Sequence, residues 1–178
     1  MPDNNLRSKN WKAHIIIIFL GLLSDQITKI WAVKEFSFPT GRINYQHTIQ
    51  VIGEWVQFRL VYNSGAAFGL QPQKLIAFLH PTLFYGIISL IAITILFFFY
   101  RNLPARETWT QIGVCLIIAG AFGNIIDRFR LHKVVDFIDA GIPGFDPRWP
   151  TFNVADSMVC IGVGIILITP LFQRKKTS

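Results

Sequence analysis

Carboxylic acids are concentrated in one stretch of this 178-residue chain. Half of its ten acidic residues lie within residues 120–157, between two strongly apolar runs. An ionised carboxylate at bilayer depth is costly unless it is paired or hydrated, so such residues are candidates for function. The five aspartates of this acidic stretch are Asp127, Asp136, Asp139, Asp146 and Asp156.

Two carboxyl groups held together in a partly dry site can perform acid–base chemistry. Repulsion and desolvation raise the pKa of one acid, so that the pair shares one proton. The ionised acid can then accept a proton from water, while the protonated acid donates a hydrogen bond to a scissile carbonyl. We select Asp136, which apolar residues flank, and Asp156, which lies beside Asn153 at the start of an apolar run. Asp127, followed by Arg128, is instead expected to be paired structurally.

An Asn-x-x-Asp arrangement occurs twice, at the margins of two apolar runs. Asn124 precedes Asp127 at the end of one run, and Asn153 precedes Asp156 at the start of the next. In a helix this spacing places both side chains on one face. Amides that donate to a carboxylate hold its rotamer and favour its charged form. The repeat predicts two helix ends that meet on the same side of a membrane.

Other catalytic and metal-binding patterns are absent from the sequence. It contains no GxSxG, HExxH or CxxC, and its four histidines lack ligand spacing. Both cysteines lie in apolar runs, so we expect them to be reduced, and we expect no metal and no cofactor. An aspartate-based hydrolase is the economical interpretation of the residues. A small proton-coupled transporter that uses intramembrane carboxylates and a non-catalytic assembly protein are the alternatives.

Composition and hydropathy indicate an α-helical integral membrane protein. The chain is 52% hydrophobic and has a mean hydropathy of +0.43, and one bilayer span takes about 20 apolar residues. Four spans leave no room for a separate soluble domain, so residues 1–178 are expected to form one membrane-embedded domain. The first apolar run resembles a signal peptide, but no small-x-small cleavage site follows it, and a retained helix is expected. The helices are expected at about residues 13–33, 74–100, 107–127 and 152–172.

The basic residues predict how the chain is oriented. They are densest in the N-terminus, in the turn at 101–106 and in the C-terminal tail, and short flanking segments of this kind stay in the cytoplasm. Both termini are therefore expected in the cytoplasm, with the acidic stretch near the outer leaflet. No basic stripe lies between aromatic residues, so the +7 charge favours anionic membrane lipids over nucleic acid.

A small extracytoplasmic β-sheet is expected between the first two helices, at about residues 45–62. Residues 56–62 alternate between two faces, and Gly53-Glu54 can form a turn between two short strands. The strand leads into NSGAAFG, where Asn63 and Gly65 permit unusual backbone dihedrals. That segment either presents N–H groups to an extended peptide or makes a tight turn into the next helix.

One pair of opposite charges lies inside the first predicted helix. Asp25 and Lys29 are four positions apart and therefore lie on one face. We favour an ion pair that orients the helix over a direct part in catalysis.

Five blocks of the chain resemble those of the bacterial lipoprotein signal peptidases, also called signal peptidase II. They occur in the family's order and span most of the chain. The departures are mild: Ser24 stands where an apolar residue is commoner, and GAFGN where GGALGN is usual. The blocks are SDQITK (24–29), YNSGAAFG (62–69), GAFGNIIDR (120–128), VVDFI (134–138) and FNVADS (152–157).

The resemblance implies a four-helix inner-membrane aspartyl protease. Its substrates would be prolipoproteins whose lipobox cysteine carries diacylglyceryl, and its catalytic dyad would be Asp136 and Asp156. A globomycin-like inhibitor is expected in the same cleft, and the chain is expected to act as a monomer. Further positions match by motif: Asn63, Gly65, Asn124, Arg128 and Asn153 as residues that support the dyad or bind substrate, with Asp25, Lys29 and Asp127 as structural polar residues. The 45–62 sheet is expected to support the substrate, and residues 134–150 are expected to act as a lid.

Overall fold

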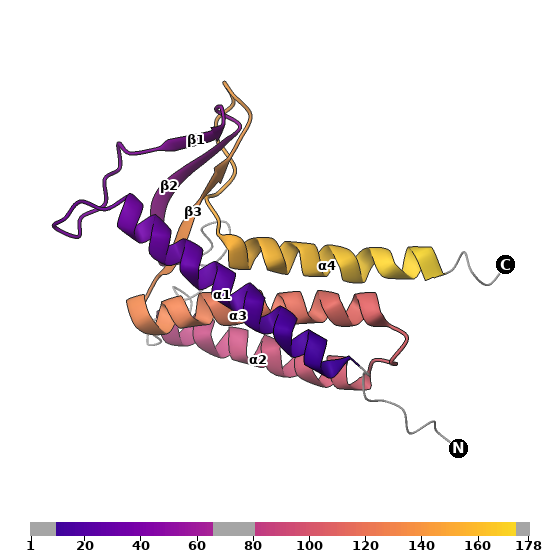
Figure 1. The fold of residues 1–178 in the computed structure, drawn as a ribbon. Coiled ribbons are helices and arrows are strands. Elements are labelled where there is room, and N and C mark those ends of the chain that lie inside the picture. The colour runs from indigo at the N-terminus through magenta and orange to yellow at the C-terminus, as the bar shows by residue number, and fades with distance from the viewer. Residues whose placement is uncertain (1–9, 66–80, 174–178) are drawn as a thin grey trace, which may run out of the picture.

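The computed structural model describes residues 10–65 and 81–173. Figure 1 shows four helices, with a small sheet at one end of the helix bundle. The helices are α1 (Trp11–Glu35), α2 (Pro81–Asn102), α3 (Thr108–Leu131) and α4 (Val154–Gln173), and the strands are β1 (Ile49–Ile52), β2 (Val56–Asn63) and β3 (Val134–Ala140).

All four helices are long and apolar enough to span a membrane. Their most apolar segments have mean hydropathies of 1.6, 2.4, 1.6 and 2.1 in chain order. In α1, α2 and α4 only 17% of the segment is buried, which suits surfaces that face lipid, whereas half of the α3 segment is buried. The predicted four-helix membrane fold is confirmed. The expected start of the second helix near Lys74 lies outside the described residues.

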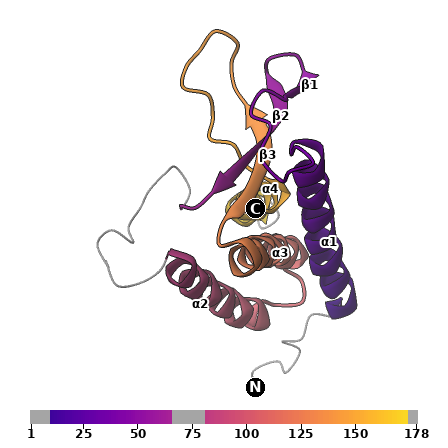
Figure 2. The same ribbon diagram turned by 90° about the vertical axis from the view of Figure 1, so that its left-hand side faces the viewer.

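Helix α3 is the centre of the bundle. It packs against α1, α2 and α4, as Figure 2 shows from the end that carries the sheet. The C-terminal ends of α1 and α3 and the N-terminal end of α4 meet at that end, and the sheet extends from it to one side (Figures 1 and 2). The two Asn-x-x-Asp sequences are thus brought to the same end of the bundle.

Glycines allow α3 to lie close to its neighbours. A Cβ atom at Gly120 would collide with the backbone oxygen of Ala155 in α4. At Gly113 it would lie 2.8 Å from the backbone oxygen of Gly162, also in α4. Small residues permit this backbone approach between membrane helices. Helix α3 therefore lies in close contact with α4 at these two glycines.

The sheet has three antiparallel strands in the order β1-β2-β3. Strands β1 and β2 lie on either side of Gly53, which has a φ of 50°, so the predicted turn at Gly53-Glu54 is confirmed. A glycine suits this position because other residues rarely adopt a positive φ. The register pairs Ile49 with Phe58 in the first ladder and Val61 with Asp136 in the second.

The third strand corrects the expected lid. Residues 134–140 were expected to belong to a lid, but they form β3, which pairs with β2 from Val56↔Ala140 to Asn63↔Val134. Most of β3 is buried, with side chains covered on both faces. The lid expectation is wrong for these residues because they are hydrogen-bonded into the sheet.

The sheet is attached to the bundle through an apolar core at the C-terminal end of α1. Ala32 of α1 and Phe36, the residue that follows α1, pack with Leu60 of β2 and with Val135 and Phe137 of β3. The Trp31 ring meets three rings of this core edge-on, those of Phe36, Phe58 and Phe137. This core fixes β3, and with it Asp136, relative to the helix ends.

Candidate active site

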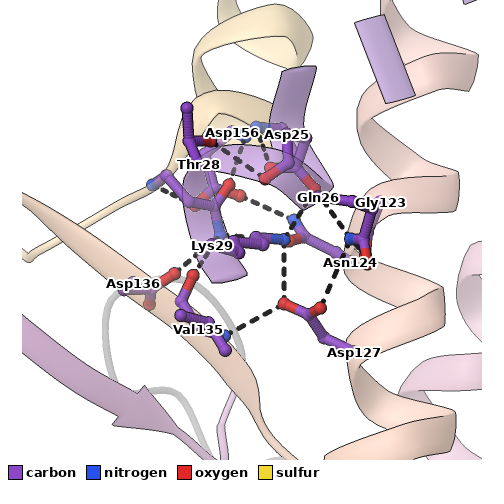
Figure 3. A network of polar contacts seen from close by, with 12 residues as sticks. Asp25, Gln26, Thr28, Lys29, Gly123, Asn124, Asp127, Val135, Asp136 and Asp156 are labelled. Atoms are coloured by element: carbon purple, nitrogen blue, oxygen red, sulfur yellow. Dashed lines mark hydrogen bonds and ion pairs between the residues drawn. The ribbon is translucent and has the colours of Figure 1, made fainter. Parts of the chain in front are cut away.

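A buried lysine joins the helices at the sheet end of the bundle. The Lys29 Nζ atom lies 2.9 Å from Asp25 Oδ2 and 2.9 Å from Asp127 Oδ2, and it donates to Asn124 Oδ1 at 3.0 Å. Figure 3 shows this network, to which Gln26 also contributes. An ammonium group has three N–H donors, and each has an acceptor here. The expected Asp25–Lys29 ion pair is confirmed, and Asp127 is paired as expected, with Lys29 as its partner.

The start of α4 is held by its own residues and by α1. Asn153 Oδ1 accepts the backbone N–H of Asp156 at 2.9 Å, and Asp156 Oδ2 accepts the backbone N–H of Asn153 at 3.3 Å. This reciprocal arrangement is a capping box. Asp25 Oδ1 accepts a further N–H of the first turn, from Ala155, at 2.9 Å. Residue 123 must be small, because a Cβ there would collide with the Asp25 carboxylate.

Asp136 reaches the same point from the sheet. It is 2% exposed and accepts hydrogen bonds from Asn153 Nδ2 at 2.7 Å and from Asn63 Nδ2 at 3.0 Å. Burial, and after it the nearby Asp156 charge, raise the pKa of Asp136 to about 7, against the opposing effects of the Asn63 and Asn153 hydrogen bonds and the Lys29 charge.

Asp156 is held on the α3 side of the site. Its Oδ1 atom accepts Asn124 Nδ2 at 2.8 Å, and its side chain is partly exposed, unlike that of Asp136. Asn153 contacts both acids, through its side chain to Asp136 and through its backbone N–H to Asp156. Asn153 Nδ2 also donates to Asn124 Oδ1 at 3.1 Å. The two asparagines of the repeated sequence therefore bridge the two acids.

A cleft of about 290 Å³ opens beside Asp136. One side is the end of β2 with the residues that follow it, including Asn63 and Gly65, and the other side is Pro150 and Thr151. The Gly65 N–H donates to Asn63 Oδ1 at 2.9 Å, which orients the Asn63 amide toward Asp136. A larger apolar groove of about 570 Å³ lies between Trp109 and Phe172, at the other end of α3 and α4. It contains no titratable group among its lining residues.

Arg128 lies at the border of this site. Its guanidinium lies 5.4 Å from the centre of the Tyr85 ring of α2 and donates to the backbone oxygen of Asn124 at 3.3 Å. Its position next to the asparagine–aspartate cluster adds positive charge close to Asp156 and Asp136.

Two polar residues of the structure were missed by sequence reasoning. Gln26 donates to Asp25 and Asp127, at 3.1 and 3.4 Å, and its place inside the SDQITK block was the available signal. Asp139 is buried in a second cluster with two arginines, outside the site described above. The remaining loop aspartate, Asp146, is exposed. In the described ranges no group of three His, Cys, Asp or Glu residues could hold a metal ion.

Comparison with known proteins gives a consistent result. Residues 17–172 match the family model of signal peptidase (SPase) II. The lipoprotein signal peptidase of Nostoc punctiforme is 40% identical over 97% of this chain and 97% of its own, and that of Treponema denticola is 38% identical over 94% and 95%.

Solved structures agree with these relatives. A bacterial membrane enzyme determined at 2.3 Å by the in meso method superposes with a TM-score of 0.74 at 30% identity, over 94% of this chain and 92% of that chain. A second such enzyme, at 1.9 Å, gives a TM-score of 0.71 at 32% identity, over 90% and 93%. The chain therefore belongs to the signal peptidase II family, the lipoprotein signal peptidases.

Proposed function

We propose that this protein is an intramembrane aspartyl endopeptidase that removes the signal peptide from diacylglyceryl-modified prolipoproteins, cleaving before the lipidated cysteine. The observation that carries the proposal is the meeting of Asp136 and Asp156, from a strand and a helix, through the shared asparagine Asn153. Family membership supports the substrate class and favours a peptidase over the transporter and assembly alternatives.

The unequal surroundings of the two acids support a division of labour. With a pKa of about 7, Asp136 carries the shared proton below neutral pH and in about half of the molecules at pH 7, and in that form it donates a hydrogen bond to the scissile carbonyl. Asp156, partly exposed, takes a proton from the attacking water, whose oxygen bonds to the carbonyl carbon. The departing amine takes a proton from the dyad as the C–N bond breaks, and one proton remains on the pair.

The surrounding residues have supporting roles in this proposal. Asn124 and Asn153 hold the two carboxylates in their rotamers, and Asn63 adds a second donor to Asp136. Arg128 and Gly65 line the approach of the substrate. Asp25, Lys29 and Asp127 are structural, because they fix the three helix ends against one another.

The membrane geometry suits a lipidated substrate. We place both termini in the cytoplasm and the sheet end of the bundle at the outer leaflet of the inner membrane, following the density of basic residues. A diacylglyceryl cysteine at headgroup depth can then reach the dyad while its acyl chains stay in lipid. A globomycin-like inhibitor would occupy the 290 Å³ cleft, and the protein would act as a monomer without a cofactor.

The test is incubation of the purified protein with a diacylglyceryl-modified precursor. Release of the signal peptide, with a new N-terminal lipidated cysteine detected by mass spectrometry, is expected. Asp136→Asn and Asp156→Asn should each abolish release while leaving the folded yield intact. The unlipidated precursor is the substrate control. Near-normal turnover by either variant would contradict the assignment of Asp136 and Asp156 as the catalytic dyad.

A further inference from the structure

A second buried charge cluster lies on the sheet, outside the proposed dyad. Asp139 of β3 is 2% exposed, and its two carboxylate oxygens are bound by different arginines. Arg59 Nε lies 2.8 Å from Asp139 Oδ2, and Arg148 Nε lies 2.9 Å from Asp139 Oδ1. A buried carboxylate is costly to leave unpaired, and here two guanidinium groups satisfy it. The cluster therefore joins the three segments to which these residues belong: β2 with Arg59, β3 with Asp139, and the β3–α4 loop with Arg148.

Arg148 connects three separate segments. It belongs to the loop between β3 and α4, it binds Asp139 of β3, and its Nη1 donates to the backbone oxygen of Glu54 in the β1–β2 turn at 2.9 Å. The guanidinium lies directly on Gly141, where a Cβ would come within 2.9 Å of Arg148 Cζ. A side chain at 141 would therefore displace the Arg148 guanidinium.

The segment that follows Arg148 is fastened at both ends. Beside Arg148, the Trp149 N–H donates to the Ala140 oxygen at 3.0 Å. At the far end, Phe152 exchanges backbone hydrogen bonds with Ile138 at 2.8 and 3.0 Å. Between these points, Arg59 Nη2 donates to Thr151 Oγ1 at 3.4 Å.

This fastened segment is part of the cleft beside the dyad. Pro150 and Thr151 form the side of the 290 Å³ cleft that faces β2 and the residues after it. Asn153, which contacts both acids, follows two residues later. Displacement of the loop at Arg148 would therefore move two residues that line the cleft, neither of which is one of the two acids.

We infer that Asp139, Arg59 and Arg148 are positioning residues that hold the Pro150–Thr151 side of the cleft at the distance needed to bind the substrate peptide. The inference rests on the proposed function. The cluster acts on substrate binding and not on the acid–base step, because none of its members contacts Asp136 or Asp156 in the described structure.

The first test is steady-state kinetics of Asp139→Asn with the diacylglyceryl-modified precursor in detergent micelles. KM should rise roughly tenfold while kcat changes by less than about twofold. This result is expected when a variant loses binding energy equally for the bound substrate and for the transition state. The pH profile of kcat should stay where it is in the wild type, because the dyad is unchanged. The matched control is Asp146→Asn, the same substitution at an exposed aspartate in the β3–α4 loop that carries Arg148. This control should leave KM unaltered.

The second test does not depend on catalysis. Trypsin needs a free arginine side chain, and the Arg148 side chain is only 24% exposed and bound to Asp139. Cleavage after Arg148, followed by mass spectrometry, should therefore become about tenfold faster in Asp139→Asn than in the wild type or Asp146→Asn. If the wild type cleaves no precursor but shows this protection, the proposed function fails and the fastening of the loop stands.

Three results would overturn the inference. One is an unchanged KM in folded Asp139→Asn, and another is a fall in kcat with a displaced pH profile, which would place Asp139 in the acid–base step. The third is unchanged tryptic cleavage after Arg148. Combining Asp139→Asn with Arg148→Gln should raise KM by less than the product of the two single effects, because both changes remove the Arg148–Asp139 contact; a fully multiplicative rise in KM would show that this contact does not hold the cleft.

Discussion

At the scale of single residues, the two acids of the proposed dyad differ in their access to water. Asp136 is buried under two asparagine donors, whereas Asp156 is partly exposed and also belongs to the first turn of α4. Desolvation favours the neutral form of Asp136 and raises its pKa to about 7. Asp136 is therefore the acid that carries the shared proton before the substrate binds.

The pH dependence of activity should report this proton. Activity should fall as pH rises through the pKa of Asp136, near 7, because the proton donor is lost. The Asn63 hydrogen bond stabilises the charged form and lowers that pKa, so Asn63→Ala should move the alkaline limb of kcat/KM to higher pH by roughly half a unit to one unit. A limb that moves to lower pH would contradict the assigned effect of Asn63.

Some of these residue contacts could be predicted from local sequence and others could not. The Asn-x-x-Asp spacing and the apolar neighbours of Asp136 were sufficient to select the dyad candidates. The contacts of Lys29 with Asn124 and Asp127, and those of Asp139 with Arg59, join residues far apart in the chain. No local pattern encodes such pairs, because they depend on how the helices and the sheet pack.

At the scale of elements, a single lysine holds three helix ends together. Lys29 of α1 binds Asn124 and Asp127 of α3, and its partner Asp25 binds the first turn of α4. Breaking a buried ion pair by removing one partner leaves an uncompensated charge. The arrangement of the acids therefore depends on charges that do not take part in the proposed reaction.

Removal of the Asp127 charge should weaken the fold more than the chemistry. Asp127→Asn should lower the free energy of unfolding by about 3 kcal/mol, seen as a lower folded yield and thermal midpoint in detergent, with activity per folded molecule largely kept. The exposed Asp146→Asn is the control for the loss of one negative charge. A well-folded but inactive Asp127→Asn protein would show that Asp127 acts in catalysis.

The contact between α3 and α4 should be sensitive to one methyl group at Gly120. A Cβ there would collide with the Ala155 oxygen, in the same first turn that carries Asp156. Gly120→Ala should cost about 1–3 kcal/mol and reduce activity by displacing that turn. Gly164→Ala is the matched control, because a Cβ at Gly164 meets nothing within 4 Å. Equal tolerance of both changes would contradict the packing described here.

The elements themselves were predicted unevenly. Long apolar runs predicted the helices, and alternation predicted β1 and β2, because one face of that part of the sheet is covered. Strand β3 was missed because it is buried on both faces and so has no period of two. Its partner β2 is separated from it in the sequence by α2 and α3, so no local pattern indicated the pairing. Residues 134–140 were therefore interpreted as part of a lid.

At the scale of the whole molecule, the orientation in the membrane decides which leaflet supplies the substrate. With Cys115 and Cys160 replaced by serine, Phe145→Cys in the β3–α4 loop should react with a membrane-impermeant maleimide in intact spheroplasts. Asn102→Cys, in the exposed end of α2 at the opposite end of the bundle, should react only after lysis. The reverse labelling pattern would place the sheet and both acids in the cytoplasm.

The order of the strands along the chain has a consequence for biogenesis. Strand β2 is synthesised before α2 and α3, but its partner β3 emerges only after both have been made, and Asp156 emerges later still. A nascent chain that has inserted three of its helices thus has two of the three strands and neither acid of the pair. Strand β3 and the start of α4 must both be synthesised and inserted before the proposed pair of acids can form, so the site assembles only late in biogenesis.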